Sequence, residues 1–556
     1  MFSLKIVLVA LALSALPQVA AGRQPGDPNE TVDIVDKVVA QEQSEIQLLR
    51  QYSPLVETYV QYLRLDKQLG AVPNGDKYFL GRAKLAKGVE LEPLAHDAGL
   101  KRKLSEGWRE FSSTSFVPGG FLQMIYLDMA GFDRQHYKFE YIHREFLGEV
   151  RCLVFDVGPL RKKDKGRFVG RIWVEDQDYH IVRFNGSYGT SFLLSNYFNF
   201  DSWRTNVGPN LWLPAFVYTE QGNVHNPQTT RLAFKPFHAQ TRLWGYHLGP
   251  VSEEQELSKV LVESPSPIKD LTETTNDYSP LQSERAWERQ AEANVTDHLE
   301  RQGLLAPYGE VDKVLETVVN NLEVTNSLEI QPEVRCRVLM TSKLESFTIG
   351  HTIVLSRGLL DVLPDEASLA GILAHELSHI VLAHGMDTQF AFFNSLQPKE
   401  RDTFHHYEFA RTKAEEQAAQ QKGNELLRNS PYDDKSVTAQ LFVEALKKGS
   451  KDFPNLVIPL LGDRVATSWT IGAVESDRKA SIDASAAMPL GGRIKVDPWS
   501  NQLQMVKSRP EVAAREAARM SFQITPFFFY LTRYGNNSAT QAPAGVAAKL
   551  DDNAKH

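Results

Sequence analysis

The sequence has few cysteines, and it has no excess of basic residues. Its 556 residues include only Cys152 and Cys336, so a disulfide framework is excluded as the main source of stability. Both lie in apolar runs, which favours two buried free thiols; a disulfide between them is the alternative in an exported chain. The formal net charge of -8 argues against nucleic-acid binding, because such proteins carry basic patches.

Long hydrophobic runs are also missing, apart from one near the N-terminus. Residues 1–21 contain Lys5, an apolar run over 6–16 and small residues at 19–21, a pattern typical of a cleaved signal peptide. An uncleaved anchor is the alternative, but the run is short against the ~20 residues of a spanning helix. We therefore expect an exported bacterial protein, periplasmic or secreted, with no transmembrane segment beyond the signal.

The remaining chain divides by composition into several expected segments. Helical periodicity extends over 35–64, and from about Gly119 short apolar and aromatic runs separated by turn residues predict an antiparallel sheet. A Pro/Ser/Thr-rich polar stretch then indicates a linker. The expected segments are a signal peptide (1–21), a polar linker and the start of the first helix (22–44), a β-rich accessory domain (45–250), a linker (251–285), a helical metallopeptidase domain (286–495), a C-terminal extension (496–535) and a disordered tail (536–556).

One part of the predicted sheet resembles a known superfamily. The stretch "LVFDVGPLRKKDKGRFVGRIWVEDQDYHIVRFNG" is similar to the curved antiparallel sheets of LolA/RseB-like lipoprotein-handling proteins. This resemblance implies a half-barrel that holds lipoprotein or acyl chains. A β-rich accessory domain without that function is the alternative.

The stretch "LAGILAHELSHIVLAHG" sets two histidines and a glutamate among apolar residues. His375, Glu376 and His379 form the His-Glu-x-x-His pattern, whose histidines lie four residues apart on one face of a helix. Both imidazoles can then reach one zinc ion, with Glu376 beside it as general base for peptide hydrolysis. Two buried histidines satisfied by their neighbours are the alternative.

A third zinc ligand is not evident next to this pattern. His384 lies about 140° around the helix from His379, and Gly385 occupies the position where another zinc-peptidase arrangement has a histidine. The third ligand is therefore expected from another helix.

A wider stretch, "ESFTIGHTIVLSRGLLDVLPDEASLAGILAHELSHIVLAHG", resembles the core of the M48 family of zinc metallopeptidases. The resemblance implies one zinc ion per chain, with Glu416 as third ligand and Glu415 and Glu408 as lesser candidates. The family's Asp four residues after the ligand is Gln420 here, and its His-Pro is Asp-Pro at 497–498. No oxyanion-stabilising residue is therefore assigned. His405, His406, Tyr407 and Arg411 are near only in sequence.

The resemblance also implies that a substrate peptide pairs with an exposed edge strand, expected at Ser346–Ile349. The overall expectation is an α+β multidomain protein, with an antiparallel β-rich domain followed by a mostly helical M48-like domain containing a small edge sheet. Its expected function is zinc-dependent endopeptidase activity on unfolded or envelope proteins. The alternative is a weakly active or inactive protease domain that acts with the sheet as a lipoprotein or acyl-chain binding module.

Overall fold

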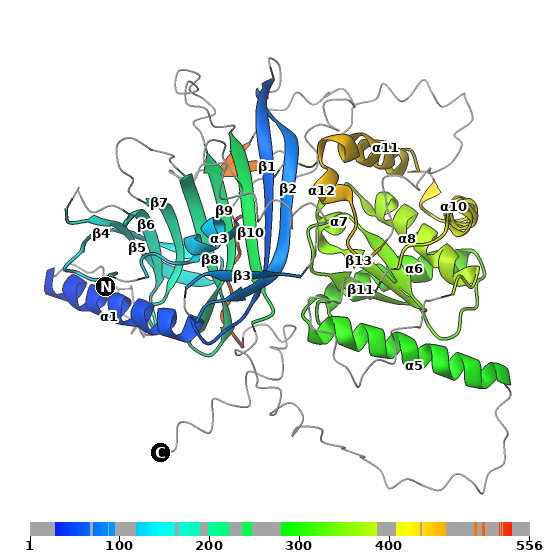
Figure 1. Ribbon diagram of the computed structural model, residues 1–556, viewed down its shortest axis with the longest axis horizontal. Coiled ribbons are helices and arrows are strands. Elements are labelled where there is room, and N and C mark those ends of the chain that lie inside the picture. The colour runs from blue at the N-terminus through cyan, green and yellow to red at the C-terminus, as the bar shows by residue number, and fades with distance from the viewer. Residues whose placement is uncertain are drawn as a thin grey trace, which may run out of the picture.

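The computed structural model describes residues 28–66, 70–86, 88–94, 118–129, 131–161, 166–188, 198–221, 236–246, 280–385, 407, 409–433, 436–462, 494–496, 503–505, 522, 524 and 526–535. The predicted signal peptide, most of the predicted linker and the predicted tail lie outside these residues. Figure 1 shows a sheet region, α1 to β10, beside a helical region, α5 to α12. Within the described residues, no helix combines the length and apolarity needed to cross a membrane.

The sheet region is built on one ten-stranded sheet in which every strand pairing is antiparallel. Its strand order, β3-β2-β1-β10-β9-β8-β7-β6-β5-β4, is open at both ends. The strands are β1 (Leu55–Asp66), β2 (Gly70–Lys84), β3 (Glu90–Pro93), β4 (Tyr137–Leu147), β5 (Val150–Pro159), β6 (Phe168–Glu175), β7 (Ile181–Tyr188), β8 (Phe198–Gly208), β9 (Leu211–Gln221) and β10 (Phe237–Trp244).

Helices cover one face of this sheet. Helix α1 (Pro28–Leu49), helix α3 (Pro118–Leu122) and the 3-10 turn η1 (Gln123–Ile125) share one apolar cluster with Phe155, Phe184 and Val217 of the sheet. On α1, Glu42 forms an ion pair with Arg204 through two hydrogen bonds, at 2.7 and 2.8 Å. The side chains of both residues are fully buried. This face of the sheet is therefore buried where the helices lie on it.

The predicted helix over 35–64 is wrong in its second half. Helix α1 ends at Leu49, and β1 begins at Leu55 after Pro54. Because β1 is buried on both faces, its apolar residues do not alternate, and their spacing imitates a helical period. Pro54 prevents the helical pattern from continuing through Ser53, since the residue before a proline avoids helical dihedral angles.

The helical region surrounds a small three-stranded sheet. Its strand order is β11-β13-β12, with β11 and β13 parallel and β12 antiparallel to β13. The elements are α5 (Pro280–Arg301), α6 (Glu310–Thr325), β11 (Arg335–Leu339), β12 (Ser346–Ile349), β13 (Thr352–Ser356), α7 (Arg357–Val362), α8 (Glu366–Val381), α10 (Lys413–Arg428), α11 (Ser436–Asp452) and α12 (Pro454–Val457). A two-stranded ribbon, β14 (Ile494–Val496) and β15 (Leu503–Met505), follows. The predicted α+β class is confirmed.

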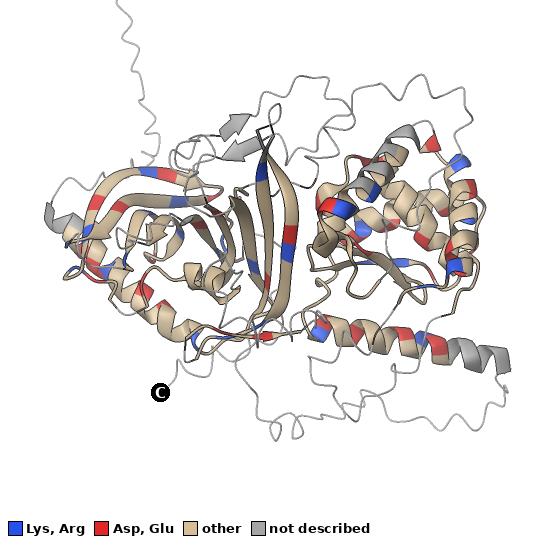
Figure 2. Cartoon of the chain, turned by 45° about the horizontal axis from the view of Figure 1, so that its top comes forward, with Lys and Arg blue, Asp and Glu red and all other residues tan. Residues whose placement is uncertain are grey.

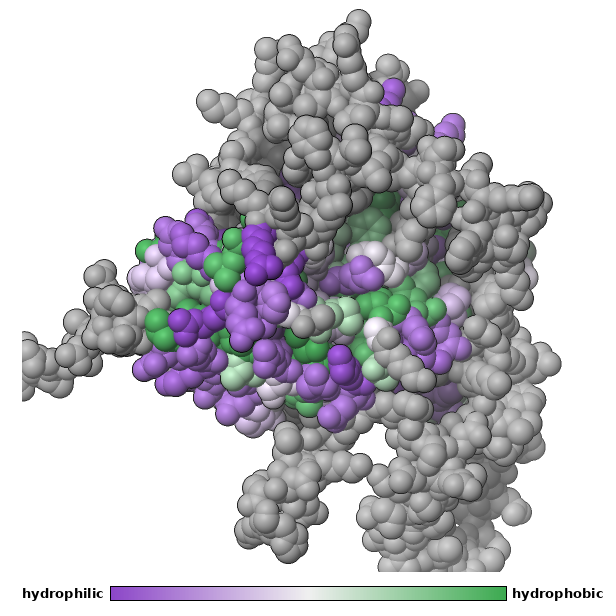
Figure 3. Space-filling view, turned by 60° about the vertical axis from the view of Figure 1, so that its left-hand side comes forward, coloured by the Kyte–Doolittle hydropathy of each residue, from purple (hydrophilic) through white to green (hydrophobic). Residues whose placement is uncertain are grey.

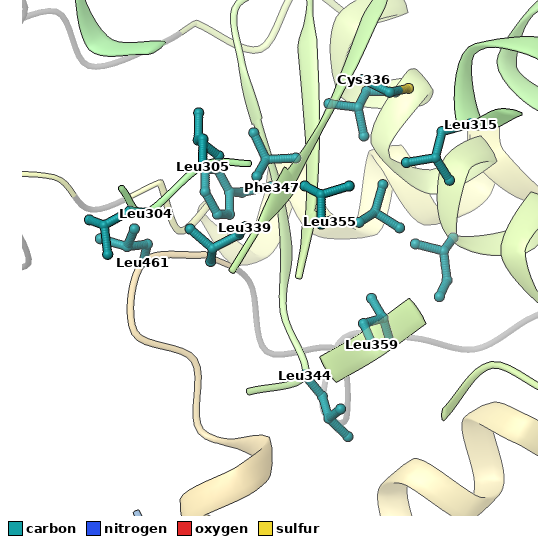
Figure 4. Packing of buried hydrophobic residues seen from close by; sticks show 14 of the residues in the cluster. Leu304, Leu305, Leu315, Cys336, Leu339, Leu344, Phe347, Leu355, Leu359 and Leu461 are labelled. Carbon is teal, nitrogen blue, oxygen red and sulfur yellow. The ribbon is translucent and has the colours of Figure 1, made fainter. Parts of the chain in front are cut away.

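Leucine and phenylalanine fill the core of the helical region. Leu339, Phe347 and Leu355 project from the three strands and pack with leucines from neighbouring loops and helices (Figure 4). Cys336 belongs to this cluster, and both Cys152 and Cys336 are buried free thiols, as the favoured interpretation predicted. Burial raises the pKa of each thiol, which keeps it protonated.

The two regions share one apolar cluster and several buried hydrogen bonds. Tyr59 of the sheet and Leu344 of the helical region belong to the same cluster. The carboxylate of Glu57 on β1 accepts hydrogen bonds from the backbone N–H and the hydroxyl of Ser342, both at 2.6 Å. Asp76 on β2 accepts hydrogen bonds from the start of α12, including the Leu456 N–H at 2.9 Å. The regions are therefore joined by more than the predicted linker.

The C-terminal segment 522–535 also packs on the sheet region. Gln61 of β1 accepts a hydrogen bond from the Ile524 N–H at 2.8 Å, and Phe529 packs against Trp203 with ring centroids 5.5 Å apart. Further along, Arg533 forms an ion pair with the buried Glu175 at 2.8 Å. This part of the predicted C-terminal extension thus contributes to the sheet region.

Charged residues of both signs are interspersed over both regions (Figure 2). Figure 3, which turns the sheet region toward the viewer, shows hydrophilic residues on its near side with hydrophobic residues between them. A hollow of about 450 Å³ in this region is bordered by charged and apolar side chains from β4, β5 and β6, among them Lys138, Glu140, Asp156, Arg171, Val157, Val169 and Trp173.

Candidate metal centre

Helix α8 carries the two histidines and the glutamate of the motif into the core. The Asp365 side chain caps its start by accepting a hydrogen bond from the Ser368 N–H at 2.8 Å. Apolar residues occur all around this helix, and such a helix is buried rather than amphipathic. His375, Glu376 and His379 accordingly expose only 3%, 0% and 1% of their surface.

Helix α10 supplies the carboxylate that faces these histidines. Its start is capped by Thr412, whose hydroxyl accepts from the Glu415 N–H while its own N–H donates to the Glu415 carboxylate at 2.9 Å. Gly423 lets α10 approach α8 closely, because a Cβ there would lie 3.1 Å from the Cα of His375. This packing fixes Glu416 beside the motif.

The three side chains form a compact donor set. One oxygen of Glu416 lies 3.3 Å from His375 Nε2, and the other lies 3.6 Å from His379 Nε2. The two imidazole Nε2 atoms are 3.3 Å apart. His375, His379 and Glu416 are thus a group that could hold a metal ion, each residue offering one ligand atom.

The chemistry of this set fits a divalent cation. Both oxygens of Glu416 are buried, and neither has a hydrogen-bond donor among the described residues. Burial, together with the neighbouring His375, Arg411 and His384, lowers the pKa of His379 to about 2, so the imidazole of His379 is neutral and has a lone pair to donate. Imidazole nitrogens and a carboxylate are typical zinc ligands, and a bound cation would compensate the buried carboxylate oxygens.

The two lesser candidates for the third ligand, and two other polar side chains near the motif, are placed as follows. The carboxylate of Glu415 is engaged by Thr412 at the helix cap, and Glu408 lies outside the described residues. His384 Nδ1 lies 2.8 Å from His379 Nδ1, on the other side of that ring from Glu416. Gln420 points along its own helix and donates to Asn424 at 3.3 Å.

Four residues were near the motif only in sequence, and the structure describes two of them, Tyr407 and Arg411. Arg411 donates to the hydroxyl of Thr348 at 2.7 Å, which connects the chain before α10 to β12. Tyr407 is buried in the core, stacked on Phe409. His405, His406 and the Asp-Pro pair at 497–498 lie outside the described residues.

The predicted edge strand is present, but it is not exposed. Strand β12 stands at the edge of the three-stranded sheet, yet all four of its residues are buried. Phe409 stacks on Phe347 with ring centroids 4.6 Å apart and an interplanar angle of 2°. The prediction that this strand is exposed was wrong, because residues distant in sequence cover it.

One contact at the motif was not foreseen from the sequence. The hydroxyl of Ser346, the first residue of β12, donates to Glu376 Oε1 at 2.6 Å. The sequence suggested only that Ser346 lies on the strand beside the zinc helix. No spacing rule pairs two residues 30 positions apart on different elements.

Comparison with known families gives a match for this region. Residues 308–398 match the model described as Peptidase family M48. The matched segment includes His375, Glu376 and His379 and ends before Glu416. The predicted resemblance is confirmed, and the match supports a metallopeptidase.

Other comparisons add less. No curated protein matches the chain. Among solved structures, the chain is similar to a DUF1329 family protein from Desulfovibrio piger ATCC 29098, with 10% identity over 40% of this chain and 95% of that chain. The TM-score of this likeness is 0.20.

Proposed function

We propose that this chain, which contains an M48-type metallopeptidase segment, is an exported zinc-dependent endopeptidase that acts on unfolded or envelope proteins. The observation that carries the proposal is the compact donor set of His375, His379 and Glu416, with Glu376 on the same helix as both histidines. A hydrolase of this type needs a metal ion, a position for water and a general base. His375, His379 and Glu416 supply ligands for the ion, and Glu376 supplies the base.

In this proposal, His375, His379 and Glu416 would hold the zinc ion. Bound there, zinc would acidify a water molecule and polarise the scissile carbonyl. Glu376 takes the proton of the attacking water and passes it to the leaving amine. The complete burial of Glu376 strengthens each of its electrostatic interactions, because little solvent screens them.

Replacing the base without touching the ligands tests this assignment. Glu376→Gln keeps the shape of the side chain but cannot accept the proton, so turnover of casein should fall by about 10²–10⁴-fold with zinc content unchanged. Activity of the wild-type chain should also be abolished by a chelator. Undiminished turnover in Glu376→Gln, or full wild-type activity with chelator present, would show that the assignment is wrong.

Export is proposed from residues 1–21 alone. If they are a signal peptide, the chain recovered from a bacterial envelope fraction should begin near residue 22, as measured by intact mass. Recovery of the full-length chain from the cytoplasm would contradict export and leave the hydrolytic proposal untouched.

The hollow in the sheet region is bordered by both charged and apolar side chains. Lys138, Glu140, Asp156 and Arg171 share its border with Val157, Val169 and Trp173, and Asp156 and Arg171 form an ion pair at 2.8 Å. We retain the enzymatic proposal because the family match and the donor set of the metal centre support it.

A further inference from the structure

The general base assigned above is held by a side chain from another element. Ser346 Oγ lies 2.6 Å from Glu376 Oε1, and both residues are fully buried. A carboxylate that acts as a base is an acceptor only, so the serine hydroxyl is the donor. Hydrogen bonds to a charged acceptor are short and roughly twice as strong as neutral ones.

The backbone that carries Ser346 is fixed on both sides. Ser346 pairs with Leu355 of β13. The preceding residue, Glu345, accepts hydrogen bonds from the backbone N–H groups of Leu460, Leu461 and Gly462, at 3.0, 2.9 and 3.1 Å. The serine therefore stands on a rigid support.

The close packing of Gly462 against β12 also holds Ser346 in place. Gly462 lies so near the strand that a Cβ there would come within 2.6 Å of the Ser346 carbonyl oxygen. A shift of the strand toward this segment is therefore blocked. The hydroxyl is held at the base by the fold, rather than by a flexible loop.

We propose that Ser346 is a positioning residue for Glu376, holding one carboxylate oxygen so that the base faces the attacking water at the metal centre. The proposal rests on the proposed function. A glutamate side chain has several staggered rotamers, and a displacement of about 1 Å at a reacting group can cost about 10²-fold in rate. The serine hydroxyl selects one of these rotamers.

The test is Ser346→Ala in the full chain, assayed with a fluorogenic peptide that the wild-type chain cleaves. Loss of an outer hydrogen bond of this kind typically costs about 10- to 100-fold in activity, so kcat should fall by that factor. KM should stay within about twofold, because substrate binding is untouched. Ser346→Thr, which keeps the hydroxyl, should recover most of the lost kcat.

Two further variants separate positioning from packing. Ser378→Ala removes an equally buried hydroxyl that donates to the Ala374 carbonyl in α8, and it should retain kcat. In a Glu376→Gln background, Ser346→Ala should cause no further loss, because the base on which it acts is already gone. Zinc content and melting temperature, measured on every variant, report whether the site and the fold remain intact.

The outcomes also separate this inference from the proposed function. If the wild-type chain has no chelator-sensitive activity, the proposed function fails and this inference fails with it. If the wild-type chain is active and Ser346→Ala keeps its kcat within about twofold, only the positioning role is overturned. Equal losses from Ser346→Ala in both backgrounds would also overturn it.

Discussion

The sheet region and the helical region compensate buried charge in different ways. In the sheet region, buried Arg204 pairs with Glu42 at 2.7 Å, and buried Arg183 pairs with Asp201 at 2.8 Å. In the helical region, the oxygens of Glu416 face the imidazole Nε2 atoms of His375 and His379, and these oxygens have no hydrogen-bond donor among the described residues. Burying carboxylate oxygens without a partner costs several kcal/mol, and a metal ion held by the three side chains would offset that cost.

Glu345 shows that a missing arginine is not by itself evidence for a metal. This carboxylate is also fully buried in the helical region, but three backbone N–H groups hydrogen-bond to it. Glu416 differs because the atoms that face it are imidazole nitrogens, which are metal ligands. The comparison therefore identifies the site by the chemistry of the facing atoms rather than by burial alone.

The largest loss of stability is expected from removing the buried arginine that neutralises Glu42 in the sheet region. Arg204→Met leaves Glu42 and Glu45 buried without their cation and should lower the free energy of unfolding by about 3–5 kcal/mol. Urea-induced unfolding followed by circular dichroism measures this loss. Arg134→Ala, which breaks an ion pair exposed on both sides, should cost less than about 1 kcal/mol. Similar small losses in both variants would contradict the account of the sheet region.

The second prediction concerns the junction of the two regions. We propose that the polar stretch 264–283, of which α5 takes up the end from Pro280, is the site of first proteolytic cleavage. Because a shared apolar cluster and the bonds of Glu57 and Asp76 join the regions, the nicked halves should elute together in size-exclusion chromatography. Halves that separate without denaturant would show that the two regions are independent.

A smaller, pH-dependent effect is expected at the C-terminal segment. Burial raises the pKa of Glu175, but the Arg533 guanidinium and nearby backbone N–H groups outweigh it and hold this pKa below its ordinary value of 4.5. The folded pKa lies below the unfolded one, so this interaction stabilises the protein above pH 4.5 and is lost as the pH falls through the folded pKa.

Arg533→Ala should therefore cost about 2 kcal/mol near neutral pH, the range for a hydrogen bond to a charged group. The difference from the wild-type chain should shrink on acidification, as measured by urea unfolding at several pH values. Arg301→Ala, a change at an exposed arginine, is the control. A loss for Arg533→Ala that stays constant down to low pH would contradict the assigned ion pair.

The sequence predicted the elements whose formation depends on residues close together in the chain. The motif on α8, its start at Asp365 and the strands on either side follow from residue spacing and capping. Glu416 came from the family resemblance, and the structure places it against both histidines. Its distinction from Glu415 depends on the cap at Thr412, which itself has a sequence signature.

The features that the sequence did not reveal depend on contacts between distant residues. Strand β1 was predicted as helix because the helical region covers its second face and removes the alternation of polar and apolar residues. The exposure of β12 was mispredicted because Phe409 packs on Phe347. Likewise, no local pattern indicates that the segment around Phe529 packs on Trp203.

The zinc content of the purified chain tests the central claim, that His375, His379 and Glu416 together hold one ion. We predict one zinc per wild-type chain by inductively coupled plasma mass spectrometry, and loss of zinc together with a lower melting temperature in Glu416→Ala, since a third ligand both completes the site and joins α10 to α8. Glu415→Ala and Glu408→Ala should keep the metal. Full zinc occupancy in Glu416→Ala, with loss in either of the other two variants, would contradict the account.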